Sequence, residues 1–175
     1  MASYQDFLDD LGQRESSGDY KIVNTLGYLG KYQFGEAALV DLGYYKGDKT
    51  NNGDKQDWIG GWTKKDGITS EKDFLSSVTA QENAIREWLD LQWDYIKEFS
   101  LEPYVGRGIK GQDITISGML AGSHLGGITN LAEYLESRGK VEFVDAYGTS
   151  IADYIAEFAS YDTPFTVGGE DFLNA

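Results

Sequence analysis

Several residue types are absent or scarce in this sequence, and each shortage excludes a class of protein. The chain has no cysteine, which excludes disulfide frameworks, thiolate nucleophiles and cysteine-based metal sites. Its two prolines stand against 22 glycines, a balance that indicates many tight turns rather than disordered linkers. No stretch approaches the roughly 18 apolar residues of a membrane span, and the N-terminus lacks the basic and apolar segments of a signal peptide. We therefore expect no membrane insertion.

Positive charge is also in short supply. The formal net charge is −14 at pH 7, and acidic residues occur along the whole chain. A field of this sign repels phosphate backbones, so nucleic acid is not an expected partner. The same charge keeps the chain soluble, and we expect a monomer.

Aromatic residues are abundant, with 12 tyrosines, 8 phenylalanines and 4 tryptophans. Together with a hydrophobic content of 41%, they are ample for the core of one domain over residues 1–175. Tyrosine and tryptophan in excess of a core supply amphipathic faces of the kind that line clefts or stack on sugars.

Apolar periodicity predicts a mainly α protein with a small β-hairpin lobe, an α+β class. Ser3 is the expected N-cap of a first helix that ends near Glu15, at the Ser-Ser-Gly that follows. The clearest helix is 79–99, where Thr79 and Glu82 have capping-box spacing. Further helices are expected at residues 34–43, 114–127, 128–139 and 149–159.

Two stretches between these helices are expected to be irregular or extended. Residues 20–34 alternate and turn, which predicts a short β-hairpin or an irregular lobe. Residues 44–69 form a polar, Gly-rich excursion, in which Trp58 and Trp62 make either a small aromatic cluster or a sugar platform. Asp48, Asn52 and Gly53 in this excursion have EF-hand spacing. The twelfth position lacks the bidentate glutamate of that motif, so we expect no metal site.

Glu15 is the first candidate for chemistry. Its carboxylate lies in the last turn of the first predicted helix, where the negative end of the helix dipole disfavours the ionised form. A general acid that works near neutral pH needs such an environment. The alternative is a helix-end glutamate that simply faces solvent.

The order of four short motifs resembles the lysozyme-like superfamily, in particular the soluble lytic transglycosylase and goose-type lysozyme branch and its phage-borne members. That branch has a helix-terminal Glu-Ser, then a Gly-Leu-Met-Gln turn, an Ala-Tyr-Asn-Ala-Gly element and a late tyrosine. The resemblance covers residues 5–160. The corresponding residues here are Glu15-Ser16, Gly30-Lys31-Tyr32-Gln33, Gly122-Ser123-His124-Leu125-Gly126, and Tyr147 or Tyr154. Two departures are a histidine in the usual asparagine place and the long excursion at 44–69.

The resemblance implies a peptidoglycan-cleaving enzyme with a lysozyme-like fold and no cofactor. It implies Glu15 as the catalytic acid and base on the glycan strand. Because no signal peptide is visible, work at the bacterial cell wall implies delivery by a phage or a secretion system. The residues implied to bind substrate are Ser16, Tyr32, Gln33, His124, Tyr147 and Tyr154.

Several of these residues have structural alternatives. The Gln33 amide can satisfy its own turn, and Tyr28 and Tyr32 can pack as a cross-strand pair. His124 is the only histidine in the chain, and a lone histidine beside an apolar helix can belong to the core.

The reaction type also stays open. A lytic transglycosylase, as the resemblance implies, uses one glutamate to protonate the glycosidic oxygen and then to deprotonate the muramyl 6-hydroxyl. A hydrolytic muramidase or a chitinase-like enzyme needs a second carboxylate. Asp19, Glu36 and Asp41 are candidates, and spacing selects none of them, which favours the transglycosylase. A non-catalytic peptidoglycan-binding module on the same fold is the third alternative.

Overall fold

The computed structural model describes residues 1–47 and 55–168 and consists of two compact units. The N-terminal unit is Leu8–Trp88, and the C-terminal unit combines Met1–Phe7 with the chain from Leu89 onward. Helices α1 (Tyr4–Ser16) and α4 (Val78–Glu98) contribute residues to both units. Among the described residues, no helix is both long and apolar enough to cross a membrane.

Helix α1 begins and ends as the sequence predicts. The Ser3 hydroxyl accepts a hydrogen bond from the Asp6 amide at 3.1 Å, and the Asp6 carboxylate accepts one from the Ser3 amide at 2.9 Å. These bonds lower the pKa of Asp6, so its ionised form is the one that caps the helix. The helix stops where Ser17 and Gly18 take left-handed backbone angles, with φ of 58° and 77°.

The rest of the N-terminal unit is short helices and turns. Residues 20–34 contain the isolated bridges Val23–Leu29 and Leu29–Phe34 instead of a ladder, so the irregular-lobe alternative is the one observed. Gly43, with a φ of 82°, follows α2, as expected for a C-cap glycine. The elements here besides α1 and α4 are α2 (Glu36–Asp41), the 3-10 turn Lys65–Gly67 and α3 (Glu71–Ser76), of which α3 was not predicted.

The capping box predicted from Thr79 and Glu82 is wrong. Helix α4 begins at Val78, and its N-terminal cap is the Ser77 hydroxyl, which accepts a hydrogen bond from the Ala80 amide at 3.0 Å. Glu82 does not turn back to the helix end, because its carboxylate is engaged by side chains from the lobe that precedes α2.

The excursion at 44–69 is packed where it is described. Tyr45 and Trp58 are buried, and the ring of Trp58 stacks on that of Trp62 with centroids 5.6 Å apart. The predicted aromatic cluster is therefore present, while a sugar platform stays a prediction. The calcium-like residues lie outside the described part of the chain: Asp48, Asn52 and Gly53.

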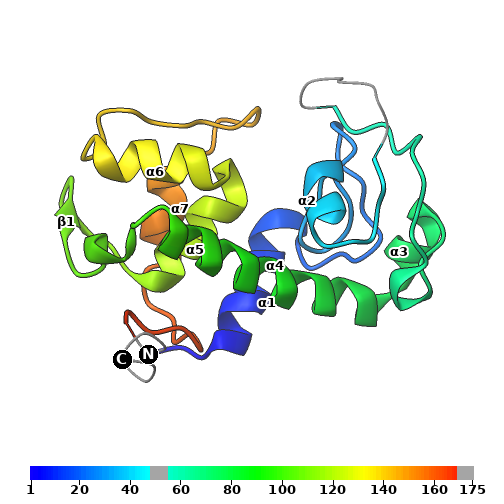
Figure 1. Ribbon diagram of the computed structural model, residues 1–175, viewed down its shortest axis with the longest axis horizontal. Coiled ribbons are helices and arrows are strands. Elements are labelled where there is room, and N and C mark those ends of the chain that lie inside the picture. Colours follow the sequence, from blue (N-terminus) through cyan, green and yellow to red (C-terminus); the bar gives the residue numbers. More distant parts are fainter. Residues whose placement is uncertain (48–54, 169–175) are drawn as a thin grey trace. The chain divides into compact units, whose positions relative to one another are not determined.

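The C-terminal unit is built around a buried helix, as its apolar sequence predicts. Helix α5 (Ile116–Gly126) is buried from Ser117 to Ser123 and packs against α6 (Ile128–Glu136) and α7 (Ile151–Glu157) (Figure 1). Small residues permit this approach, since a Cβ added at Gly118 would lie 2.8 Å from the carbonyl oxygen of Ile155. Helix α7 starts with a capping box between Ser150 and Asp153, which selects Ser150 over Thr149 as its cap.

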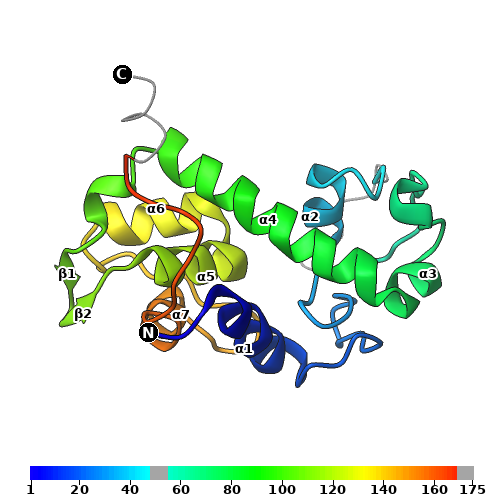
Figure 2. The same cartoon turned by 90° about the horizontal axis from the view of Figure 1, so that it is seen from below.

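The two-stranded antiparallel sheet is in this unit and not at 20–34 (Figure 2). Strands β1 (Gly108–Ile109) and β2 (Gln112–Asp113) pair with Ile109 opposite Gln112. Lys110 and Gly111 connect them with positive φ values of 52° and 78°, the angles that a tight two-residue hairpin requires. The fold is thus mainly helical with a small β element.

Candidate functional site

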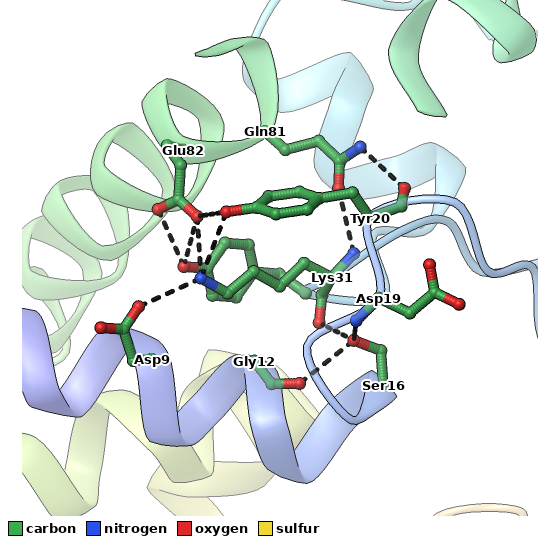
Figure 3. Close-up of polar contacts among 9 residues, drawn as sticks. Asp9, Gly12, Ser16, Asp19, Tyr20, Lys31, Gln81 and Glu82 are labelled. Carbon is green, nitrogen blue, oxygen red and sulfur yellow. Dashed lines mark hydrogen bonds and ion pairs between the residues drawn. The ribbon is translucent and has the colours of Figure 1, made fainter. Parts of the chain in front are cut away.

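Lys31 is a buried lysine at the centre of a polar cluster in the N-terminal unit (Figure 3). Its ammonium nitrogen is 2.9 Å from Oε1 of Glu82 and 3.1 Å from Oδ1 of Asp9, and its side chain is only 9% exposed. A charge buried to this degree is tolerated when it is paired. Here one partner comes from α4 and the other from α1.

The backbone of Lys31 is held on both sides as well. Its amide donates to Oε1 of Gln81 at 3.0 Å, and its carbonyl accepts from the Ser16 hydroxyl at 2.7 Å. Gln81 is fully buried, and its amide nitrogen donates to the carbonyls of Tyr20 and Phe74, each at 2.9 Å. The first turn of α4 therefore fixes the backbone of the lobe as well as its side chains.

Two tyrosines complete the hydrogen bonding of Glu82. The Tyr20 hydroxyl donates to Oε1 at 2.8 Å, and the Tyr32 hydroxyl lies 3.1 Å and 2.9 Å from the two carboxylate oxygens. The Lys31 ammonium also lies 5.2 Å and 5.0 Å from the centroids of these two rings, within cation–π range. The carboxylate is thus surrounded by donors from one lobe.

These contacts set the charges of the cluster. Burial raises the pKa of both the Tyr20 and Tyr32 hydroxyls, and the neighbouring Glu82 raises them further, so both stay protonated donors. Burial opposes the charge on Lys31, but hydrogen bonds to Glu82 and the other partners outweigh it and raise the Lys31 pKa above its ordinary value. The lysine therefore remains a cation at any physiological pH.

Two glycines make room for this arrangement. A Cβ added at Gly12, inside α1, would lie 2.5 Å from Cε of Lys31, so the lysine stem crosses the helix at that point. Gly30 has a φ of 75°, and a Cβ there would lie 2.2 Å from Oε1 of Gln81. Both positions need glycine because other side chains pass directly over them.

The structure brings the first two predicted motifs together. Glu15 is half-buried in the last turn of α1, and Ser16 next to it is 7% exposed. The Ser16 hydroxyl accepts from the Asp19 amide at 3.0 Å and bonds to the Lys31 carbonyl in the second motif. Ser16 thus has backbone partners on both sides, and direct contact with a substrate stays a prediction for this residue.

Tyr32 and Gln33 differ in what they offer a ligand. Tyr32 is fully buried, and its hydroxyl bonds to Glu82. Its contact with a sugar stays a prediction. Gln33 is half-buried with a φ of 57°, and its amide nitrogen donates to the carbonyls of Gly30 at 3.0 Å and Tyr28 at 3.4 Å. A non-glycine residue in this conformation is uncommon, although seven other described residues of this chain share it, so the angle alone does not indicate a site. No donor among the described residues bonds to the side-chain oxygen of Gln33, which leaves an acceptor for a ligand.

Comparisons with other proteins add no family name. No model of a known protein family, no curated protein and no solved structure matches this chain. The resemblance to the lysozyme-like superfamily therefore rests on the four motifs, two of which are joined through Ser16 and Lys31.

The other predicted binding residues belong to the C-terminal unit. His124 is half-buried near the end of α5, Tyr154 is buried in α7, and Tyr147 is 58% exposed in the loop before α7. The structure describes these residues in a different unit from Glu15, so a shared site stays a prediction.

The three candidates for a second carboxylate all lie in the N-terminal unit. Asp19 is exposed and accepts from the Lys21 amide at 2.8 Å, and Glu36, half-buried, accepts from the Asp57 amide at 3.0 Å. Asp41 is exposed at the end of α2. No cluster of three or more potential metal ligands occurs among the described residues.

The sequence analysis placed Lys31 in the second motif and Glu82 in a capping box, but it predicted no contact between them and did not single out Gln81. Lysine and glutamate ordinarily indicate solvated positions, and their contact here joins residues 51 positions apart. One signal was present, because a glycine inside an amphipathic helix marks a close approach by another part of the chain. Gly12 is such a glycine.

Proposed function

We propose that this protein cleaves the glycan strands of peptidoglycan at the β-1,4 bond between N-acetylmuramic acid and N-acetylglucosamine. The observation that carries the proposal is the 2.7 Å hydrogen bond from Ser16 to the Lys31 carbonyl. It joins the helix-terminal Glu-Ser motif to the Gly-Lys-Tyr-Gln turn, two elements that are 15 residues apart in sequence. The first two motifs of the lysozyme-like resemblance are thus in contact, and we propose a lysozyme-like fold together with the function.

Glu15 is the proposed general acid and base. Glu15 is half-buried at the end of α1, where its carboxyl group meets the negative end of the helix dipole, which disfavours the ionised form. It donates its proton to the glycosidic oxygen as the bond from the muramyl C1 breaks. The muramyl 6-hydroxyl oxygen then bonds to C1, and its proton returns to the Glu15 carboxylate. The product is a 1,6-anhydro ring, with no water consumed.

Gln33 is the proposed substrate-orienting residue in the N-terminal unit. Its amide nitrogen is engaged by its own turn, while its oxygen is an acceptor suited to the N–H of an N-acetyl group. The strained turn fixes this oxygen in place without a loss of side-chain freedom on binding. In the C-terminal unit, the proposed glycan-contacting residues are His124, Tyr147 and Tyr154.

A hydrolytic muramidase is the second candidate. The observation in its favour is that the Asp19 amide donates to the Ser16 hydroxyl, which places a second carboxylate residue close to Glu15 along the folded loop. An Asp19 that activates water makes a reducing-end product instead of an anhydro ring. In either reaction the protein acts as a monomer at the bacterial cell wall, after delivery by a phage or a secretion system.

Replacement of the proposed acid tests the function. Glu15→Gln keeps the size of the side chain but removes its proton, so release of soluble fragments from purified sacculi is expected to fall by about 10²–10⁴-fold. Glu136→Gln is the matched control, because Glu136 is an exposed glutamate at the end of another helix, α6. Circular dichroism establishes that both variants are folded. Near-wild-type lysis by folded Glu15→Gln rules out the assignment.

A further inference from the structure

We propose that Lys31 is a positioning residue, which holds the turn carrying Gln33 against the end of α1 that carries Glu15, with Glu82 as its counter-charge. The inference rests on the proposed function, because it concerns the geometry of cleavage at Glu15. It assigns a role in that geometry to a residue that is itself too buried to meet a glycan strand.

All three polar atoms of Lys31 contact residues of α1 or α4. Toward α1, its carbonyl accepts from Ser16 at 2.7 Å and its ammonium meets Asp9 at 3.1 Å. Toward α4, its amide donates to Gln81 at 3.0 Å and its ammonium meets Glu82 at 2.9 Å. Figure 3 shows the lysine reaching between the two helices. A shift of the turn relative to either helix breaks at least two of these bonds.

The neighbouring side chains restrict the Lys31–Glu82 ion pair to one geometry. The lysine stem crosses α1 at Gly12, and the rings of Tyr20 and Tyr32 flank its ammonium. Both tyrosine hydroxyls also bond to Glu82, so the carboxylate has no second orientation that keeps its donors. A buried ion pair adds little stability relative to apolar residues of the same volume, whereas it can specify one geometry. Specification of the turn therefore explains this cluster better than stability does.

Loss of the Glu82 carboxylate is expected to displace Gln33, although the two side chains are not in contact. Without Glu82, the Lys31 ammonium keeps Asp9, whose side chain is 55% exposed, so it is expected to shift toward Asp9 and water. The Lys31 backbone is one residue from Tyr32 and two from Gln33. A displacement of about 1 Å in a substrate-orienting group costs up to about 10²-fold in rate. The turnover defect is thus expected at temperatures where the protein is still folded.

The kinetic test uses Glu82→Gln and Lys31→Met, with Lys72→Met as the control for removal of an exposed lysine. Turnover of soluble glycan strands is measured well below the melting temperature of each variant. We expect kcat to fall by about 10–100-fold in both variants and to keep its wild-type value in the control. The double variant Lys31→Met/Glu82→Gln removes both charges of the Lys31–Glu82 pair, and the carboxylate that remains, Asp9, is 55% exposed. It therefore supplies a folded sample if a single variant does not fold, and the same loss is expected. Wild-type kcat in the folded variants overturns the inference.

Amide hydrogen exchange separates this inference from the proposed function. Glu82→Gln is expected to speed exchange at Lys31, Gln33 and Phe34, and Lys72→Met is not. The Lys31 amide donates to Gln81, and the amides of Gln33 and Phe34 donate to Gly30 and Leu29 within the turn. If the wild-type protein releases nothing from sacculi, the proposed function fails, and exchange alone decides whether Lys31 positions the turn. Faster exchange then supports the positioning role, and unchanged exchange at all three amides overturns it.

Discussion

Gly12 lies inside α1, where a glycine costs about 0.5–1 kcal/mol relative to alanine. Its retention is explained by Lys31, whose Cε, Cγ and Cδ all lie within 3.1 Å of where a Cβ at Gly12 would stand. The lysine stem cannot move away freely, because its ammonium and its backbone are both hydrogen-bonded. Gly12 thus lowers the helix propensity of α1 but leaves space for the Lys31 side chain in its observed position.

Gly12→Ala is therefore expected to destabilise the protein, although alanine is the better helix former. Overpacking of this kind costs about 1–3 kcal/mol, which exceeds the gain in propensity. Urea denaturation measures the free energy of unfolding, and Gln13→Ala, at the exposed neighbouring position of α1, serves as the control. A Gly12→Ala protein more stable than the wild type means that Lys31 does not need its observed path.

Part of the candidate site is readable at the residue scale. Glu15, Ser16 and Gln33 stand out from the sequence because a helix end, a Ser-Ser-Gly stop and a Gly-flanked turn are local signals. The roles of Lys31 and Glu82 could not be predicted in this way, because their ion pair joins residues that are 51 positions apart in the sequence. Sequence reasoning also gave Glu82 a local role as a capping residue, which the distant partners override.

At the scale of elements, the sequence predicts Thr79 as the N-cap of α4, whereas the structure has Ser77 in that role. Ser77→Ala removes the hydroxyl that accepts from the Ala80 amide, and this is expected to cost about 1 kcal/mol of stability. Thr79→Ala is the matched control, because Thr79 is exposed in the first turn and caps nothing, so its effect is expected within about 0.5 kcal/mol. Thermal or urea unfolding of the two variants makes the comparison. A larger loss of stability in Thr79→Ala than in Ser77→Ala means that Thr79 is the cap and that α4 begins two residues later.

Helices were more predictable than strands, for a physical reason. α1, α4, α6 and α7 have apolar residues at helical spacing over about two turns or more, and α5 is a nearly continuous apolar run, so their signals are local and repeated. α3 has only six residues, too few for a periodic pattern. The β element was assigned to 20–34 because that stretch alternates, but its internal hydrogen bonds form turns and isolated bridges, and Tyr20 and Lys31 bond to α1 and α4. The real hairpin depends on a two-residue turn at Lys110-Gly111.

At the scale of the whole molecule, the net charge of −14 bears on how a substrate is recognised. Such a field gives no long-range attraction to an anionic polymer, so binding must depend on local contacts. Gln33 is the proposed contact in the N-terminal unit, and His124 and Tyr147 are the proposed contacts in the C-terminal unit. Composition could predict this requirement, but the partition of the candidates between two units could not be read from the sequence.

The central claim is that the protein cuts a glycosidic bond with Glu15 as its only acid and base. Mass spectrometry of purified sacculi digested in the presence of EDTA tests this claim most directly. The account predicts muropeptides with 1,6-anhydro ends from the wild-type protein and from Glu136→Gln, and none from Glu15→Gln. Reducing ends in their place mean hydrolysis, with Asp19 and Glu36 as the first positions to substitute. Intact glycan strands after digestion, or strands cut only in their peptide cross-links, contradict the account.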